Sequence, residues 1–239
     1  MGTTDLYLDC ATCGLNEEKC VGHFGHIELH ERVFHIGFFT HIKKILSCIC
    51  IRCSKLLIYK NEEDIKRVLL NKTGKNRFKE IRKLCKNITY CQKENYGCGA
   101  MIPKIKKVKT SYTINLVAEN NVQFLNADNI QDTKKIKEIL TAEKCYNILK
   151  NISDVDCEIL GFPKENRPEM MIIKTFPVPP VAVRPSSKSD NFITISYEDD
   201  LTIQISNIVM TNQTVKKYKD KEKSTNKNII YKTVDGNLH

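Results

Sequence analysis

The sequence has no long apolar run. Its longest apolar stretches, such as VFHIGFF at 33–39 and ILSCICI at 45–51, are far shorter than the ~20 residues that a bilayer-spanning helix needs. Its first residues also lack the basic region followed by an apolar run that marks a secretory signal. We therefore expect a soluble protein of the cell interior that is neither inserted in a membrane nor secreted.

The sequence also lacks the motifs of common enzymes. It contains no glycine-rich phosphate loop, no nucleophile elbow, no His-Glu-x-x-His pattern and no Asp-rich cluster of the kind that holds magnesium. The acidic run EDDL at 198–201 is interpreted as the start of a helix, where negative charge complements the helix dipole. We therefore predict no catalytic residues in this chain.

Eleven cysteines are present, and neither their number nor the absent signal suits a disulfide framework. An odd count leaves one thiol unpaired, and such frameworks persist in oxidising compartments. Several cysteines instead form short-spaced pairs within the first hundred residues. Charged residues make up 28% of the chain and apolar residues 41%, as in ordinary globular proteins. Metal binding is the leading interpretation of the cysteine pairs.

The first group of candidate ligands has the spacing Cys-x2-Cys-x6-Cys-x2-His and consists of Cys10, Cys13, Cys20 and His23. Two residues between ligands let one tight turn direct both side chains at a single ion. His26 is an alternative fourth ligand, although the spacing favours His23. Four protein ligands leave no open coordination position, so the pattern predicts a structural zinc ion.

The second group joins two distant pairs, namely Cys50 and Cys53 with Cys91 and Cys98, and 37 residues separate the pairs. A metal held by both pairs would clamp the intervening segment at its base. Cys85 competes with Cys98 as a ligand. Gly97 and Gly99 permit the tight turn that a zinc knuckle requires, which favours Cys98. The remaining cysteines are interpreted as small buried side chains: Cys48, Cys145 and Cys157.

The net charge is +10, and most of the excess lies at 61–120, where Lys and Arg outnumber Asp and Glu more than twofold. A local basic field favours a polyanionic partner. A solvated, lysine-rich helix surface would have the same composition. If the field serves binding, the candidate contacts to phosphates are Lys104, Lys106, Lys107 and Lys109.

Apolar periodicity predicts a mixed architecture of the α+β class. The pattern indicates helices at 33–46, at 61–70 and 75–88 with Asn61 and Asn76 as candidate caps, and around 141–152 and 153–160. Strands are expected at 110–117 and 121–125 around a turn at 118–120, and at 191–197. The proline-rich segment 176–186 should be an extended connector. An amphipathic piece begins at 198, and the Lys/Asn-rich tail at 216–239 should be poorly ordered.

Several long segments of the sequence resemble those of a known family. They are MGTTDLYLDCATCG, CVGHFGHIELHERVFHIGFFTHIKKIL, CICIRCSKLLI, GCG at 97–99, RPEMMIIKTFPVPPVAVRPS and EDDLT. In this order they resemble the N-terminal clamp region of the largest subunit of eukaryotic-type DNA-directed RNA polymerase, especially polymerase II and its relatives in large DNA viruses. The resemblance runs from Met1 to about Lys217.

The resemblance implies a zinc-stabilised clamp domain of helices with small strand pairs at 1–215, followed by the tail at 216–239. Both cysteine groups match the clamp zinc sites of the family, and Cys98 rather than Cys85 completes the second. In the family the clamp closes over DNA and the RNA–DNA hybrid. The implied partners are therefore nucleic acid and other polymerase subunits, including the rest of the largest subunit and the second-largest subunit.

The chains of family members continue far beyond the EDDLT segment and include an Asp-rich loop that holds the catalytic magnesium. This sequence lacks that loop. We therefore expect a fragment or split N-terminal part that is inactive by itself. The alternative is a free-standing zinc module for nucleic acid or protein, derived from a polymerase gene. Abundant Lys, Asn and Ile suit an AT-rich viral genome. A viral protein would act in host cytoplasm or in the virion, and a cellular one in the nucleus.

Overall fold

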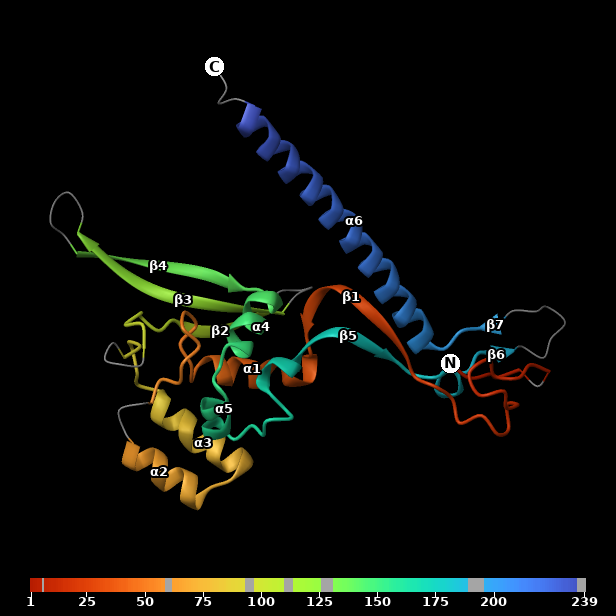
Figure 1. Cartoon of the computed structure of the whole chain (residues 1–239), viewed down its shortest axis with the longest axis horizontal. Coiled ribbons are helices and arrows are strands. Elements are labelled where there is room, and N and C mark those ends of the chain that lie inside the picture. The colour runs from red at the N-terminus through yellow and green to blue at the C-terminus, as the bar shows by residue number, and fades with distance from the viewer. Residues whose placement is uncertain are drawn as a thin grey trace. The chain divides into compact units, whose positions relative to one another are not determined.

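The computed structural model describes residues 1–5, 7–58, 62–92, 97–109, 114–125, 131–188 and 196–235. The chain forms two compact units, of which one combines Met1–Arg32 with Lys174–His239 and the other is Val33–Ile173. Helices and strands are both present in the described residues (Figure 1), in agreement with the predicted mixed architecture. No helix among these residues has the length and apolar character needed to cross a bilayer.

Helix α1 (Phe39–Leu46) lies in the core of the unit Val33–Ile173. Its four buried residues recur at three- and four-residue steps: Phe39, Ile42, Ile45 and Leu46. The predicted helix at 33–46 was too long, because β1 (Gly25–Phe34) continues to Phe34 and a 3-10 turn, η1 (Ile36–Phe38), follows. The His35 N–H donates to the Met171 carbonyl, and the His35 imidazole accepts from the Gly37 N–H. The first bond fixes the chain at the end of β1, and the second caps η1.

Helices α2 (Glu62–Asn71) and α3 (Gly74–Cys85) form the predicted two-helix insertion and pack on one another. The expected cap at Asn76 is wrong, because α3 begins at Gly74 and Thr73 occupies the N-cap position with extended backbone. Asn61 lies outside the described residues. The Arg77 guanidinium donates to carbonyls of Lys72 and, at 3.2 Å, of Glu158. These bonds tie α3 to the turn before it and to α5.

Strands β2 (Lys104–Lys109), β3 (Ile114–Leu125) and β4 (Gln131–Leu140) form an antiparallel sheet in the order β2-β3-β4 (Figure 1). The turn predicted at 118–120 is wrong, because β3 runs through these residues and pairs with β4 on its other side. One face of the sheet joins the core through four buried residues: Ile105, Leu116, Ala118 and Leu140.

Helices α4 (Ala142–Lys150) and α5 (Asp154–Leu160) follow the sheet, as predicted. Thr141 caps α4 by accepting from the Lys144 N–H, and Ser153 caps α5 by accepting from the Asp156 N–H at 3.1 Å. These bonds satisfy backbone donors that the helices leave free. Gly161 ends α5 with a φ of +91°, a conformation that favours glycine.

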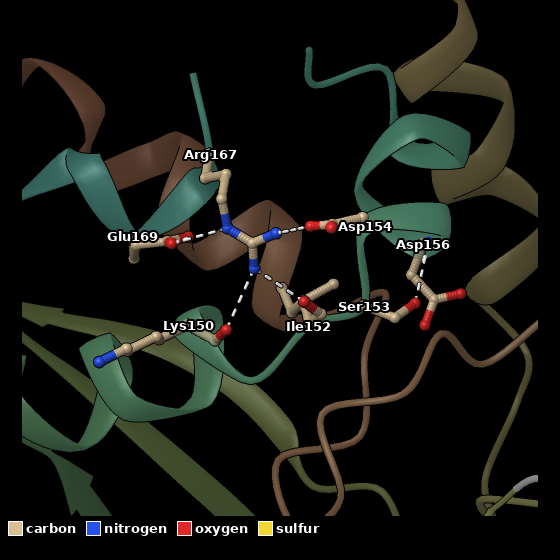
Figure 2. Close-up of polar contacts among 7 residues, drawn as sticks. All are labelled: Lys150, Ile152, Ser153, Asp154, Asp156, Arg167 and Glu169. Carbon is tan, nitrogen blue, oxygen red and sulfur yellow. Dashed lines mark hydrogen bonds and ion pairs between the residues drawn. The ribbon is translucent and has the colours of Figure 1, made fainter. Parts of the chain in front are cut away.

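Arg167 holds the end of α4 and the start of α5 together (Figure 2). Its guanidinium donates to the carbonyls of Lys150 at 3.1 Å and Ile152 at 2.8 Å. It also forms ion pairs with Glu169, at 2.7 Å, and with Asp154. The planar fork of an arginine can satisfy several acceptors at once. Arg167 precedes the 3-10 turn η2 (Pro168–Met171), so one side chain fixes three successive segments.

In the other unit, β1 pairs with β5 (Ile172–Val178). The first residues of the proline-rich segment lie in β5 rather than in a connector, and proline is tolerated there because a two-stranded sheet has only edge strands. The 3-10 turn η3 (Val181–Val183) and the short pair β6 (Ser187–Lys188) and β7 (Ser196–Tyr197) come next. Residues 191–195 of the strand predicted at 191–197 lie outside the described residues.

Helix α6 (Asp200–Asp235) ends the described chain. Its start agrees with the interpretation of EDDL, because the Asp199 carboxylate accepts from the Leu201 N–H at 2.8 Å. The helix continues through Lys216, where the tail was expected to begin, and the order of that tail in solution stays a prediction. The Asn212 amide donates to the Glu28 carbonyl and accepts from the His30 N–H, both at 2.8 Å.

Candidate metal centres

The first cluster is built on a loop before β1. Its four ligand atoms, on Cys10, Cys13, Cys20 and His23, lie within 4.8 Å of one another. The Cys13 and Cys20 sulfurs are 3.7 Å apart, and so are the Cys20 sulfur and His23 Nε2. Zinc–sulfur bonds of about 2.3 Å imply tetrahedral edges of about 3.8 Å. The donor set and its separations therefore fit one tetrahedral ion, whereas His26 lies outside the cluster on β1 and is exposed.

Backbone amides favour a thiolate in this loop. The Thr12 N–H lies 3.4 Å from the Cys10 sulfur. Hydrogen bonds from the backbone N–H groups of Cys13 and Thr12 lower the pKa of Cys10 to about 5. A deprotonated thiol is the form that binds a metal. The loop is thus prepared for a cation before one binds.

The second cluster joins two loops at the base of the α2–α3 insertion. Its members, whose sulfurs lie within 4.8 Å of one another, are Cys50, Cys53, Cys91 and Cys98. Across the two loops, the Cys50 and Cys98 sulfurs are 3.6 Å apart and the Cys53 and Cys91 sulfurs 3.7 Å. Burial raises the pKa of Cys50 to about 12. A cation is therefore needed to stabilise its thiolate.

Both clusters use the same local turn. The residue after the second cysteine of each Cys-x2-Cys pair has a positive φ, +68° at Gly14 and +59° at Ser54. Its N–H donates to the carbonyl of the first cysteine, at 2.7 Å for Gly14 and 2.8 Å for Ser54. This bond closes the turn and leaves both sulfurs on one side. The repeated geometry explains why two intervening residues suit a shared ion.

Cys85, the competing ligand, lies outside the second cluster. Its thiol is directed at the Cys48 carbonyl, with a separation of 3.6 Å, and the Cys48 thiol donates to the Lys44 carbonyl at 3.2 Å. Cys48, Cys145 and Cys157 are buried, as interpreted from the sequence, and Cys85 is buried as well. None of the eleven cysteines forms a disulfide.

Gly97 is predicted to be essential to the second cluster. A Cβ at this position would lie 2.1 Å from the Gln92 carbonyl oxygen and 2.6 Å from the Cys91 sulfur. We expect Gly97→Ala to displace Cys91 and to lower the bound metal by about one ion per chain, as measured by elemental analysis. Gly74→Ala is the control for a strained alanine outside the cluster, because its φ of +49° disfavours alanine but nothing lies within 4 Å of its Cβ. Equal metal contents in the two variants would contradict this prediction.

The four lysines predicted to contact phosphates are divided between two faces of β2. Residues of a strand alternate between faces, so Lys104 and Lys106 lie on one face and Lys107 and Lys109 on the other. Lys106 pairs with Glu119, and the Lys107 ammonium lies 5.4 Å from the centre of the Phe39 ring. The four lysines therefore do not form one patch.

Four cations that were not predicted accompany Lys104. They come from α3 and the residue that follows it, and line the same hollow as Lys104: Lys79, Arg82, Lys83 and Lys86. Three of them, Lys79, Lys83 and Lys86, have the spacing of one helix face. That spacing was visible in the sequence, but their proximity to β2 was not.

The fold brings together two Cys/His clusters, each of which could hold a metal ion. Residues 1–235 match the family described as RNA polymerase Rpb1, domain 1, and the chain belongs to that family. The match includes 216–235, which were expected to belong to a separate tail.

Two curated relatives are similar to this chain. The DNA-directed RNA polymerase subunit 1 of Acanthamoeba polyphaga mimivirus is 49% identical over 92% of this chain and 15% of its own length. The DNA-directed RNA polymerase II subunit RPB1 of Euplotoides octocarinatus is 38% identical over 91% of this chain and 45% of its own length. The chain thus spans less than half the length of each relative.

Proposed function

We propose that this chain is the N-terminal clamp part of the largest subunit of a DNA-directed RNA polymerase, and that it takes part in transcription. The match of residues 1–235 to domain 1 of that subunit is the observation that supports this function. On this proposal, residues 1–215 form the clamp region and 216–239 its tail. The clamp closes over DNA and the RNA–DNA hybrid. The protein acts in host cytoplasm or the virion if viral, and in the nucleus if cellular.

Both clusters are proposed to hold structural zinc. Three thiolates with an imidazole, or four thiolates, form the soft, four-coordinate donor sets that zinc takes in structural sites. No ligand position is left for water, so neither ion would activate a nucleophile. The second ion would fasten the α2–α3 insertion between Cys53 and Cys91. The first would fix the loop before β1.

The proposed function is tested by purifying the tagged chain from its native source under conditions that keep zinc bound. A second-largest polymerase subunit should be recovered with it. A chain with Cys10→Ser and Cys91→Ser should recover less of that subunit, because both metal sites are incomplete. Recovery of the intact chain without any polymerase subunit would favour the free-standing zinc module instead.

The isolated chain is predicted to make no RNA. Two-metal phosphoryl transfer requires carboxylates that converge on magnesium. Within the described residues, the clusters able to hold a metal are the two Cys/His groups and contain no carboxylate. Incorporation of labelled nucleotides on a primed DNA template should therefore stay at background. Template-dependent RNA synthesis by the pure chain would contradict the assignment.

A further inference from the structure

Two adjoining hollows lie beside the β2-β3-β4 sheet, within the unit Val33–Ile173. The larger, between α3 and β2, has a volume of about 750 Å³, and the smaller, lined by Tyr90 and residues of the sheet, about 390 Å³. They share three lining residues, Thr89, Ile102 and Lys104, and are therefore neighbours. We call the two together the basic groove.

Cations dominate the lining of the basic groove. The α3 side contributes Lys79, Arg82, Lys83 and Lys86, and the sheet side contributes Lys104, Lys106 and Lys135. One carboxylate, on Glu119, belongs to the lining, and it pairs with Lys106. The same lysine and its neighbours Lys137 and Lys135 lower the pKa of Glu119.

Most of this positive charge is not neutralised. Lys83 pairs with Glu80 at 2.9 Å. No ion pair to Lys79, Arg82, Lys86 or Lys104 is present among the side chains that the structure describes. Close like charges are unfavourable without a counter-charge. The groove therefore suits a ligand that carries several negative charges at regular intervals.

The groove also offers a group that phosphate alone would not use. The Tyr90 side chain lines the smaller hollow and is 61% exposed. An exposed aromatic ring can stack on a base.

We infer that the basic groove binds single-stranded nucleic acid, with phosphates on the lysines and Arg82 and a base on the Tyr90 ring. This inference rests on the proposed function, because a transcribing polymerase brings single strands to its surface. A positive groove with an aromatic platform is the usual design for single strands. A duplex keeps the faces of its bases stacked, so it would leave the Tyr90 ring unused.

The test uses the full zinc-loaded chain and fluorescein-labelled single strands of about 12 nucleotides, a length within the range of known sites. Binding is followed by anisotropy at several salt concentrations. Each phosphate contact contributes about 0.7 to the slope of log affinity against log salt. We expect the triple variant Lys79→Gln, Lys86→Gln and Lys104→Gln to reduce this slope by about 2. The matched control is Lys72→Gln, Lys75→Gln and Lys164→Gln, which removes three exposed charges from outside the groove.

The Tyr90 variants test the stacked base separately. Tyr90→Ala should weaken single-strand binding about tenfold without changing the salt slope, and Tyr90→Phe should bind as the unaltered chain does. Equal slopes in the two lysine variants would overturn the inference. Tighter binding of a duplex with no effect of Tyr90→Ala, or binding of an acidic peptide but no oligonucleotide, would also overturn it.

Metal analysis of every variant checks that the fold is retained. If the triple lysine variant loses metal, the two Tyr90 variants still test whether the groove binds single strands. Failure of the groove can be distinguished from failure of the proposed function. If oligonucleotide binding is absent but the second-largest subunit still co-purifies, the groove assignment alone is wrong. If the oligonucleotide binds as expected but no polymerase subunit is recovered, the proposed function is wrong and the groove stands.

Discussion

The purified chain is expected to contain two zinc ions, one in each Cys/His cluster. Each cluster has four ligand atoms within 4.8 Å of one another, which is a complete tetrahedral set. Apparent binding free energies of structural zinc are about 10–16 kcal/mol in small modules, whereas whole domains are stable by only about 5–15 kcal/mol. Removing both ions with a chelator should therefore lower the thermal midpoint strongly, as measured by circular dichroism.

Single substitutions can assign each ion to its cluster. Cys10→Ser and Cys91→Ser should each lower the zinc content from about two ions to about one, because three ligands remain. Cys85→Ser is the matched control, since Cys85 is a buried thiol outside both clusters, and it should keep two ions. The second site would be ruled out if the unaltered chain contained about one zinc ion and Cys91→Ser did not change that content.

Replacing Arg167 by Ala is expected to lower the free energy of unfolding by about 2–4 kcal/mol. The guanidinium contacts two carbonyls and two carboxylates (Figure 2). Its loss would leave Glu169, whose side chain is only 14% exposed, without its cation. The contact to Asp154 adds little, because that carboxylate is 69% exposed and solvent screens the pair. Urea unfolding measures the change.

Two further variants identify the cause of that loss. Arg167→Lys keeps the charge but not the planar fork, so it should recover only part of the stability. Lys164→Ala, at a nearby exposed position, should change stability by no more than about 0.5 kcal/mol. If Arg167→Ala proves as mild as Lys164→Ala, the connection between α4, α5 and η2 does not depend on this side chain.

The candidate ligands were predictable because each pair is local in sequence. The Cys-x2-Cys turns at Cys10 and Cys50 bring two sulfurs together through one backbone bond, whatever the rest of the chain does. The caps at Thr141 and Ser153 and the start of α6 after Asp199 were predictable for the same reason. Helix propensity and capping act within a few residues, so the sequence pattern contains this information.

The predicted elements were wrong where pairing with a strand distant in sequence outweighs the local conformational preference. Residues 33–34 have helical spacing but extend β1, whose partner β5 lies well over a hundred residues further on. Residues 118–120 look like a turn, yet they pair with β4. Strand β4 itself, QDTKKIKEIL, has no counterpart among the predicted elements because its many lysines are poor strand formers. The basic groove was missed because α3 and β2 meet only in the folded chain.

The Asn212 amide has a consequence for how the chain avoids self-association. A strand edge offers unpaired N–H and C=O groups to any passing strand, which makes such edges sites of aggregation. Asn212 occupies one donor and one acceptor of β1, as a neighbouring peptide group would. Lys219 adds a bond to the His30 carbonyl and an ion pair to Glu31. By covering this edge with two side chains, α6 makes β1 a poor template for amyloid-like pairing between molecules.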